Sequence, residues 1–121
     1  MDIKLELVII PVTDVDRAKD FYTGIGFNAD FDASPSPGIR FVQLTPPGSA
    51  CSIALGEGLT TATPGSVEGL QVVVASAEEA RNHLIAAGHD IEPVTDMGWG
   101  KFVFFADPDG NKWAVQEPPK R

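Results

Sequence analysis

The residues with the most obvious chemical capacity form an acidic pair near the C-terminus, in the stretch FFADPDGNKWAVQE from Phe104 to Glu117. Two carboxylates this close together could serve as a general acid and a general base. Asp107 and Asp109 nevertheless flank a proline and precede Gly110, and these are the residue types of a tight turn in which Asp binds nearby backbone. Apolar runs lie on both sides, so the stretch predicts a hairpin whose turn carboxylates are exposed and not catalytic.

Three further side chains could bind a metal or act as a nucleophile. His83 is expected in a helix and His89 just after it, whereas a zinc site needs several converging ligands. Cys51 lies inside the run ACSIAL without a neighbouring base, and is best interpreted as a small buried residue. Because it is the single cysteine, an intrachain disulfide is excluded. We predict no catalytic residue, no metal ligand and no cofactor from these side chains.

The composition is that of a globular protein with an acidic surface. The chain has 121 residues, which suits one domain, with 43% hydrophobic and 21% charged residues. A net charge of −8 argues against nucleic acid or an anionic membrane as a partner. The N-terminal MDIKLELVIIPV has an acidic second residue and only a short apolar stretch, so it is expected to form a strand and not a signal peptide or a membrane span. The expected location is the cytoplasm.

The order of predicted elements is strand, helix and three strands, and it occurs twice. Capping-box spacing marks both helix starts, at Thr13 or Asp14 and at Ser76, and glycines mark their ends. A glycine, threonine and proline stretch separates the two halves as a linker over 57–67. The strands are expected at 3–12, 27–31, 39–44, 51–55, 70–74, 91–94, 101–106 and 112–117, and the helices at 13–23 and 76–87.

The two halves also match position by position, as an internal repeat does. An offset of 62 residues takes Leu7 to Gly69 and Gly26 to Gly88. The same offset places the turn TPPG, which begins at Thr45, on the turn DPDG. We interpret the chain as a duplication, with modules at about 1–56 and 68–118.

The tandem arrangement, the pattern from Val12 to Tyr22 (VTDVDRAKDFY) and the late DPDGN turn resemble the vicinal oxygen chelate superfamily, which includes glyoxalase I, bleomycin-resistance proteins and extradiol dioxygenases. The resemblance spans essentially the whole chain. It implies an α+β fold of tandem βαβββ modules that form a concave, cup-shaped mixed sheet with the helices outside. It also implies a homodimer.

In the enzymes of this superfamily, four strand positions supply His, Gln or Glu ligands to a divalent metal in the cup. The resemblance places these positions at Leu7, Ala54, Gly69 and Ala114, and none of these side chains can coordinate a metal. A register shifted by one residue would instead bring Glu6 and Glu117 into the cup. That register is disfavoured because it would bury glutamines under the helices and expose apolar rows.

Strand alternation then indicates which residues line the cup. The expected face is small and apolar with a few amides, which suits an organic ligand better than an ion. Trp99, between two glycines, could stack on a ligand or pack elsewhere, and Gln71 and Gln116 could bind each other, water or a ligand. For Phe41 and Phe105 the alternation leaves the face open. The predicted ligand-binding residues are Leu7, Ile9, Phe41, Gln43, Ser52, Ala54, Gln71, Trp99, Phe105, Ala114 and Gln116.

These observations support two hypotheses of different classes. The first is a metal-free protein that binds a small organic molecule in the cup, in the manner of the bleomycin-resistance proteins. The alternative is a glyoxalase-like lyase or isomerase that uses a metal as a Lewis acid, and it requires donors at positions that hold Leu, Ala and Gly. Metal-independent proton transfer would need a perturbed acid on the inferred face, and a structural role would need a cup filled by its own side chains.

Overall fold

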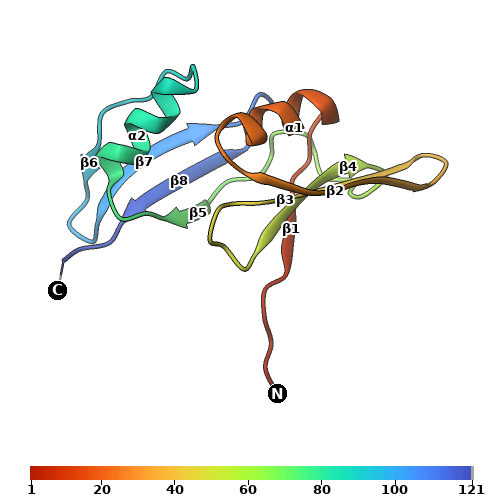
Figure 1. The fold of residues 1–121 in the computed structure, drawn as a ribbon, viewed down its shortest axis with the longest axis horizontal. Coiled ribbons are helices and arrows are strands. Elements are labelled where there is room, and N and C mark those ends of the chain that lie inside the picture. Colours follow the sequence, from red (N-terminus) through yellow and green to blue (C-terminus); the bar gives the residue numbers. More distant parts are fainter. Residues whose placement is uncertain (121) are drawn as a thin grey trace. The chain divides into compact units, whose positions relative to one another are not determined.

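The structure is a computed structural model that describes residues 1–120, and it divides into two compact units (Figure 1). Unit 1 comprises Met1–Ser66 together with Asp107–Asn111. Unit 2 comprises Val67–Ala106 and the chain from Lys112 onward. The short segment Asp107–Asn111 therefore belongs to unit 1, although the strands on either side of it belong to unit 2.

Unit 1 contains a four-stranded sheet in the order β1-β4-β3-β2 and one helix, α1. Strand β1 runs parallel to β4, and the other neighbours are antiparallel. The side chain of Asp14 caps α1 by accepting a hydrogen bond from the Arg17 amide at 3.0 Å, so Asp14 and not Thr13 begins the helix. The elements are β1 (Leu7–Ile9), α1 (Val15–Gly24), β2 (Asn28–Ser36), β3 (Ile39–Thr45) and β4 (Ser52–Glu57).

Unit 2 repeats this topology, with the order β5-β8-β7-β6 and with β5 parallel to β8. Ser76 caps α2 through a 3.1 Å bond from the Glu79 amide, as the capping-box spacing predicts. The elements are β5 (Leu70–Val73), α2 (Ala77–Ala86), β6 (Thr95–Asp96), β7 (Lys101–Ala106) and β8 (Lys112–Glu117). The predicted α+β fold of tandem βαβββ modules is confirmed.

Each sheet buries one face against its own helix. In unit 1 the paired side chains of β3 and β4 that point toward α1 are Val42 with Leu55 and Leu44 with Ile53, and all four are buried. In unit 2 the carboxylate of Glu117 accepts a hydrogen bond from the first amide of α2, at Ala77, over 2.9 Å. Residues two apart on a strand share a face, so the buried Trp113 and Val115 lie on this helix side as well.

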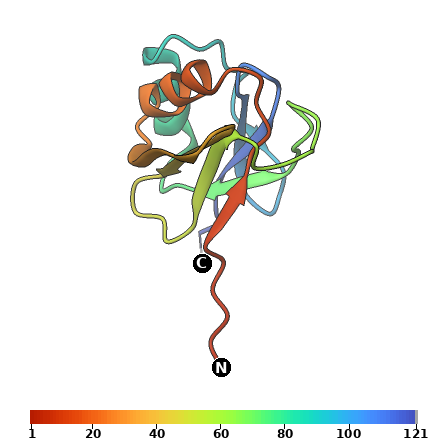
Figure 2. The same cartoon turned by 90° about the vertical axis from the view of Figure 1, so that its right-hand side faces the viewer.

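Three predicted strands are wrong in their extent, and one of them, expected at 27–31, is observed as β2 over Asn28–Ser36. The first strand was expected over 3–12, but β1 covers only Leu7–Ile9, and the segment before it leads away from the sheet in both views (Figures 1 and 2). The strand expected at 91–94 does not form, and β6 begins at Thr95. The guanidinium of Arg81 donates to the carbonyls of Ile91 and Glu92 at 2.8–3.1 Å, and Pro93 has no amide proton for a ladder. The backbone there is satisfied by a side chain instead of a strand.

The prediction that the turn carboxylates are exposed is wrong for both residues. The side chain of Asp109 is 6% exposed, and Asp107 is 5% exposed. Its carboxylate accepts from the hydroxyl of Tyr22 at 2.9 Å and from the side-chain amide of Asn111 at 2.8 Å. It also accepts from the backbone amides of Asp109 and Asn111 at 3.0 and 2.9 Å. Tyr22 and Asn111 are fully buried, so this is a closed polar cluster inside unit 1.

Neighbouring segments pack closely around this cluster, and at Gly65 they leave no room for a side chain. The side-chain amide of Asn111 also donates to the carbonyl of Pro11 at 2.9 Å, and the hydroxyl of Thr13 donates to Asp109 at 2.7 Å. Gly65 donates its amide to the same Pro11 carbonyl. With φ at +80°, a Cβ at Gly65 would lie 2.0 Å from the carbonyl oxygen of Asp109. The backbone contact at this position therefore requires glycine.

The cluster makes a prediction about stability. Asp107→Asn keeps the shape of the side chain but replaces one accepting oxygen with an NH2 group, which would then face the donors of the cluster. We therefore expect it to lower the free energy of unfolding by about 2 kcal/mol. Asp20→Asn, which changes an exposed carboxylate on α1, should alter it by less than about 0.5 kcal/mol. Urea unfolding followed by circular dichroism measures both. Equal effects of the two substitutions would show that the cluster does not hold unit 1 together.

Candidate functional site

The face of each sheet opposite its helix, here called the open face, carries most of the predicted site residues. In unit 1 the strand register aligns Leu7 with Ser52, Ile9 and Gln43 with Ala54, and Phe41 with Gly56. Aligned residues on neighbouring strands point the same way, so these side chains share the open face. The structure thereby settles the ambiguity for Phe41, which lies on this face.

In unit 2 the register aligns Gln71 and Phe104 with Ala114, and this places all three on the open face. The prediction for Phe105 is corrected. Its ring stacks on Trp113 with the centroids 5.5 Å apart, on the side that α2 covers. Phe104, which is 49% exposed, takes its place on the open face. Sequence reasoning missed this because both faces of β7 are apolar, and only the pairing with β8 resolves them.

Large apolar side chains remain exposed on the open faces. Phe31 in β2 aligns with Gln43 and is 62% exposed, and Ile9 lies in the same sheet at 38%. In unit 2, Val73 is 66% exposed and aligns with Gln116. Trp99, in the turn between β6 and β7, is 62% exposed. Each unit thus exposes large apolar side chains of its own, and such exposed groups are typical of a binding surface.

The turn at 97–100, between β6 and β7, carries Trp99 and is here called the tryptophan turn. Two glutamines and this turn form a hydrogen-bonded chain on the open face of unit 2. The amide nitrogen of Gln71 donates to the amide oxygen of Gln116 at 2.9 Å. The amide nitrogen of Gln116 donates to the backbone carbonyl of Trp99 at 3.0 Å. Gln116 therefore anchors the turn that carries the exposed indole.

A second chain, which sequence reasoning did not find in full, lies on the open face of unit 1. The amide nitrogen of Gln43 donates to the hydroxyl of Ser52 at 3.2 Å, and the hydroxyls of Ser52 and Thr45 are 2.7 Å apart. Thr45 donates to the carboxylate of Asp30, which also accepts from the side chain of Asn28. Asp30 was not predicted because a bulge in β2 between Ala29 and Phe31 disrupts the alternation that would have placed it.

The residues at the four expected metal positions do not fit a divalent ion. Leu7, Ala54 and Ala114 lie on the open faces, and Gly69 directly precedes β5. None carries a donor atom on its side chain. Within residues 1–120, no three His, Cys, Asp or Glu side chains gather closely enough to hold a metal. Glu117, the ligand of the alternative register, points instead to the start of α2.

The titratable groups with clearly shifted pKa values in the described part of the chain lie on the helix side of unit 1. Hydrogen bonds from the guanidinium of Arg40 and then from the ammonium of Lys19 hold the pKa of the Asp32 carboxyl far below its usual range. The same bond to Asp32, followed by one to Asp16, raises the pKa of Arg40. Asp32 aligns with Val42, whose side chain is buried under α1. These shifted groups are ion pairs that join the sheet to the helix on the surface of unit 1. They do not provide an acid on the open face.

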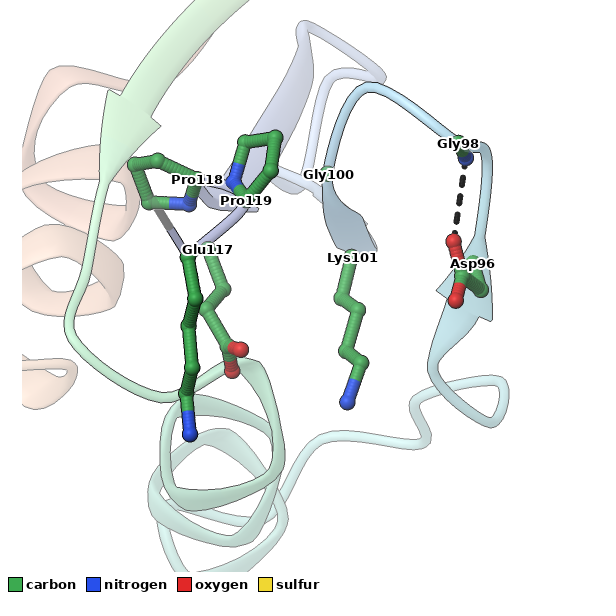
Figure 3. A pocket seen from close by; sticks show the side chains of 8 residues that line it. Asp96, Gly98, Gly100, Lys101, Glu117, Pro118 and Pro119 are labelled. Atoms are coloured by element: carbon green, nitrogen blue, oxygen red, sulfur yellow. Dashed lines mark hydrogen bonds between the residues drawn. The ribbon is translucent and has the colours of Figure 1, made fainter.

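A shallow depression of about 300 Å³ lies at the end of β6, β7 and β8 in unit 2 (Figure 3). The side chains of Lys101 and Glu117 point the same way there from adjacent strands, and Asp96 accepts from the amide of Gly98 at 3.0 Å. Prolines 118 and 119 border it. Both carboxylates of the depression already accept a backbone amide through one oxygen, Glu117 from Ala77 and Asp96 from Gly98.

Comparison with known proteins gives the family. The model of the Glyoxalase/Bleomycin resistance protein/Dioxygenase superfamily matches residues 4–115. The chain belongs to this superfamily. No curated protein sequence matches it significantly. In the described part of the chain, no helix is both long enough and apolar enough to cross a membrane.

Solved structures of superfamily members are similar over nearly the whole chain. TnmS3, an antibiotic binding protein from Streptomyces sp. CB03234, is 31% identical, with a TM-score of 0.87 over 98% of this chain and 99% of its own. A superfamily member from Sphaerobacter thermophilus DSM 20745 is also 31% identical, with a TM-score of 0.84 over 96% and 98%. A glyoxalase/bleomycin resistance protein from Streptomyces sp. CB03234 is 30% identical, with a TM-score of 0.81 over 94% and 100%.

The anchoring of the tryptophan turn by Gln116 can be tested without a ligand. Gln116→Leu removes the bond to the Trp99 carbonyl, so we expect backbone amides in residues 96–100 to exchange with solvent about tenfold faster. Gln71→Leu is the matched control, because it removes an amide from the same face but leaves that bond in place. Hydrogen–deuterium exchange by mass spectrometry measures both. Similar exchange in the two variants would contradict the anchoring role.

Proposed function

We propose that this superfamily member binds small organic molecules on the open face of each sheet and does so without a metal. The observation that carries the proposal is the combination of exposed Phe31, Trp99 and Phe104 with hydrogen-bonded amides on those faces. Apolar area with a few placed polar groups is the usual composition of a site for organic ligands. The sheets offer no comparable set of donors for an ion.

The likeness to TnmS3 supports the same function. That protein is described as antibiotic binding, and it is similar to this chain over 98% of the length of the chain. An antibiotic with an aromatic or other flat apolar part would match the exposed rings by stacking and the amides by hydrogen bonding. We therefore propose antibiotics of this kind as the ligand class to screen first.

A metal-dependent lyase or isomerase of the same superfamily is the alternative that the proposal excludes. It would require donors where the chain has Leu7, Ala54, Gly69 and Ala114. Elemental analysis of the dialysed protein separates the two, because a stoichiometric divalent metal would overturn the metal-free proposal.

The contribution of the tryptophan turn to binding gives a quantitative test. A panel of aromatic antibiotics that includes bleomycin is screened by native mass spectrometry, and each bound compound is then titrated. We expect Trp99→Ala to weaken binding about tenfold, because it removes an exposed stacking surface. Ile85→Ala, which trims an exposed apolar residue on α2, should leave the affinity unchanged.

The proposal fails if no compound of the panel binds the unsubstituted protein. It also fails in its present form if Ile85→Ala weakens binding as much as Trp99→Ala does. In that case the ligand would not be on the open face.

We also propose that the protein is a homodimer, as the superfamily resemblance implies. Support comes from the segment before β1, where apolar Ile3 and Leu5 alternate with polar residues and are 88% and 71% exposed. Covering these two side chains with a second copy of the chain would bury apolar surface that otherwise faces water.

The dimer proposal predicts that Ile3→Ser combined with Leu5→Ser weakens self-association. Each buried aliphatic side chain contributes about 1.5–3 kcal/mol, so the dissociation constant should rise by at least about tenfold. Ile85→Ser is the control, since it removes a similarly apolar exposed group from α2. Light scattering across a dilution series gives the mass. A monomer at all concentrations, or a dimer that the double substitution does not weaken, would contradict the proposal.

A further inference from the structure

The chain of hydrogen bonds on the open face of unit 1 has only one possible direction. The hydroxyl of Thr45 donates its single proton to the carboxylate of Asp30. Thr45 can then only accept from Ser52, which in turn has no proton left for Gln43. Ser52 must therefore accept from the amide nitrogen of Gln43.

This direction fixes which end of the Gln43 amide is available to a ligand. The two ends of a glutamine amide have nearly the same shape, and only the hydrogen-bond partners decide which is which. Here the nitrogen is held by Ser52, whose side chain is 5% exposed, so the oxygen Oε1 is the end left for a new partner. Gln43 is aligned with Phe31 and Ala54 on the open face, and its carbonyl is thus presented beside an exposed ring.

The chain in unit 2 obeys the same rule with a different end point. The backbone carbonyl of Trp99 can only accept, so Gln116 must direct its nitrogen there and its oxygen to Gln71. Gln71 therefore donates through its nitrogen, and its Oε1 is the end left for a partner. Both open faces hold an amide in the orientation that accepts a hydrogen bond.

We propose that Asp30 and Thr45 are positioning residues that orient the Gln43 amide, and that the ligand therefore carries a hydrogen-bond donor, a hydroxyl or an amine, next to its apolar part. This inference rests on the proposed binding function and refines its ligand class. Ligands that present only acceptors, such as ethers or carboxylates, would meet an oxygen at this place and bind less well.

Thr45→Val tests the orientation because valine has nearly the same shape but neither donates nor accepts. The proton of Ser52 is then released from Thr45 and can be given to Gln43 Oε1, so the amide is no longer held in one orientation. Thr45→Ser is the matched control, since it retains the hydroxyl and with it the whole chain of bonds.

The first measurement needs no ligand. Nuclear Overhauser effects between the Nε2 protons of Gln43 and the Cβ protons of Ser52 report which end of the amide faces the serine. We expect them at full strength in the unsubstituted protein and in Thr45→Ser, and we expect them to weaken in Thr45→Val. Their absence from the unsubstituted protein, or their undiminished strength in Thr45→Val, would overturn the inference whatever the protein binds.

The second measurement compares two probes of the same ring system, 2,7-dihydroxynaphthalene, which can donate, and 2,7-dimethoxynaphthalene, which cannot. The ratio of their dissociation constants, obtained by isothermal titration calorimetry, should shift about fivefold toward the dimethoxy probe in Thr45→Val and should not shift in Thr45→Ser. An unchanged ratio in Thr45→Val would overturn the donor requirement while leaving the binding function intact. Failure of every probe and antibiotic to bind would instead contradict the proposed function, and the orientation would still be decided by the first measurement.

Discussion

The buried carboxylate of Asp107 is the interaction on which unit 1 depends most. A carboxylate with 5% exposure is tolerated only when its oxygens are fully hydrogen-bonded, and Asp107 receives four donors. Two of them are backbone amides of its own turn, one is the side-chain amide of Asn111, and one is the hydroxyl of Tyr22 near the end of α1. A turn that looks like an ordinary connection between β7 and β8 is therefore part of the packing of unit 1. The tyrosine and the turn are constrained together, although 85 residues separate them in sequence.

The elements that could be predicted from the sequence are those determined by local interactions. Capping residues gave the starts of α1 and α2, and strand alternation gave the open face wherever one side of a strand was clearly apolar. Alternation could not decide Phe105, because β7 has apolar residues on both faces and only its stacking on Trp113 fixes the side. The missing strand at 91–94 and the burial of Asp107 both depend on side chains distant in sequence, from Arg81 and Tyr22. A single sequence does not reveal such partners.

Over residues 1–120, the open faces lack the side-chain donors that a metal site of this fold needs. The four positions at which the superfamily enzymes hold a metal are here Leu7, Ala54, Gly69 and Ala114, and these residues leave room and apolar surface instead of charge. The polar groups that remain on these faces are mostly neutral amides and hydroxyls arranged in hydrogen-bonded chains. Fold alone does not determine function, and the chemistry of these few positions is what distinguishes a binding surface from a metal centre.

The two chains of hydrogen bonds end differently, and this difference affects how the protein can change. In unit 1 the last acceptor is the side chain of Asp30. A single substitution there can therefore remove the group that sets the direction of donation along the whole row of hydrogen bonds. In unit 2 the last acceptor is the main-chain carbonyl of Trp99, which every amino acid possesses and no substitution deletes. The direction of the hydrogen bonds is therefore set by a side chain in unit 1 and by the backbone in unit 2. A substitution at Asp30 removes the end point of the first row, whereas the second row keeps its end point and changes only through Gln71 or Gln116.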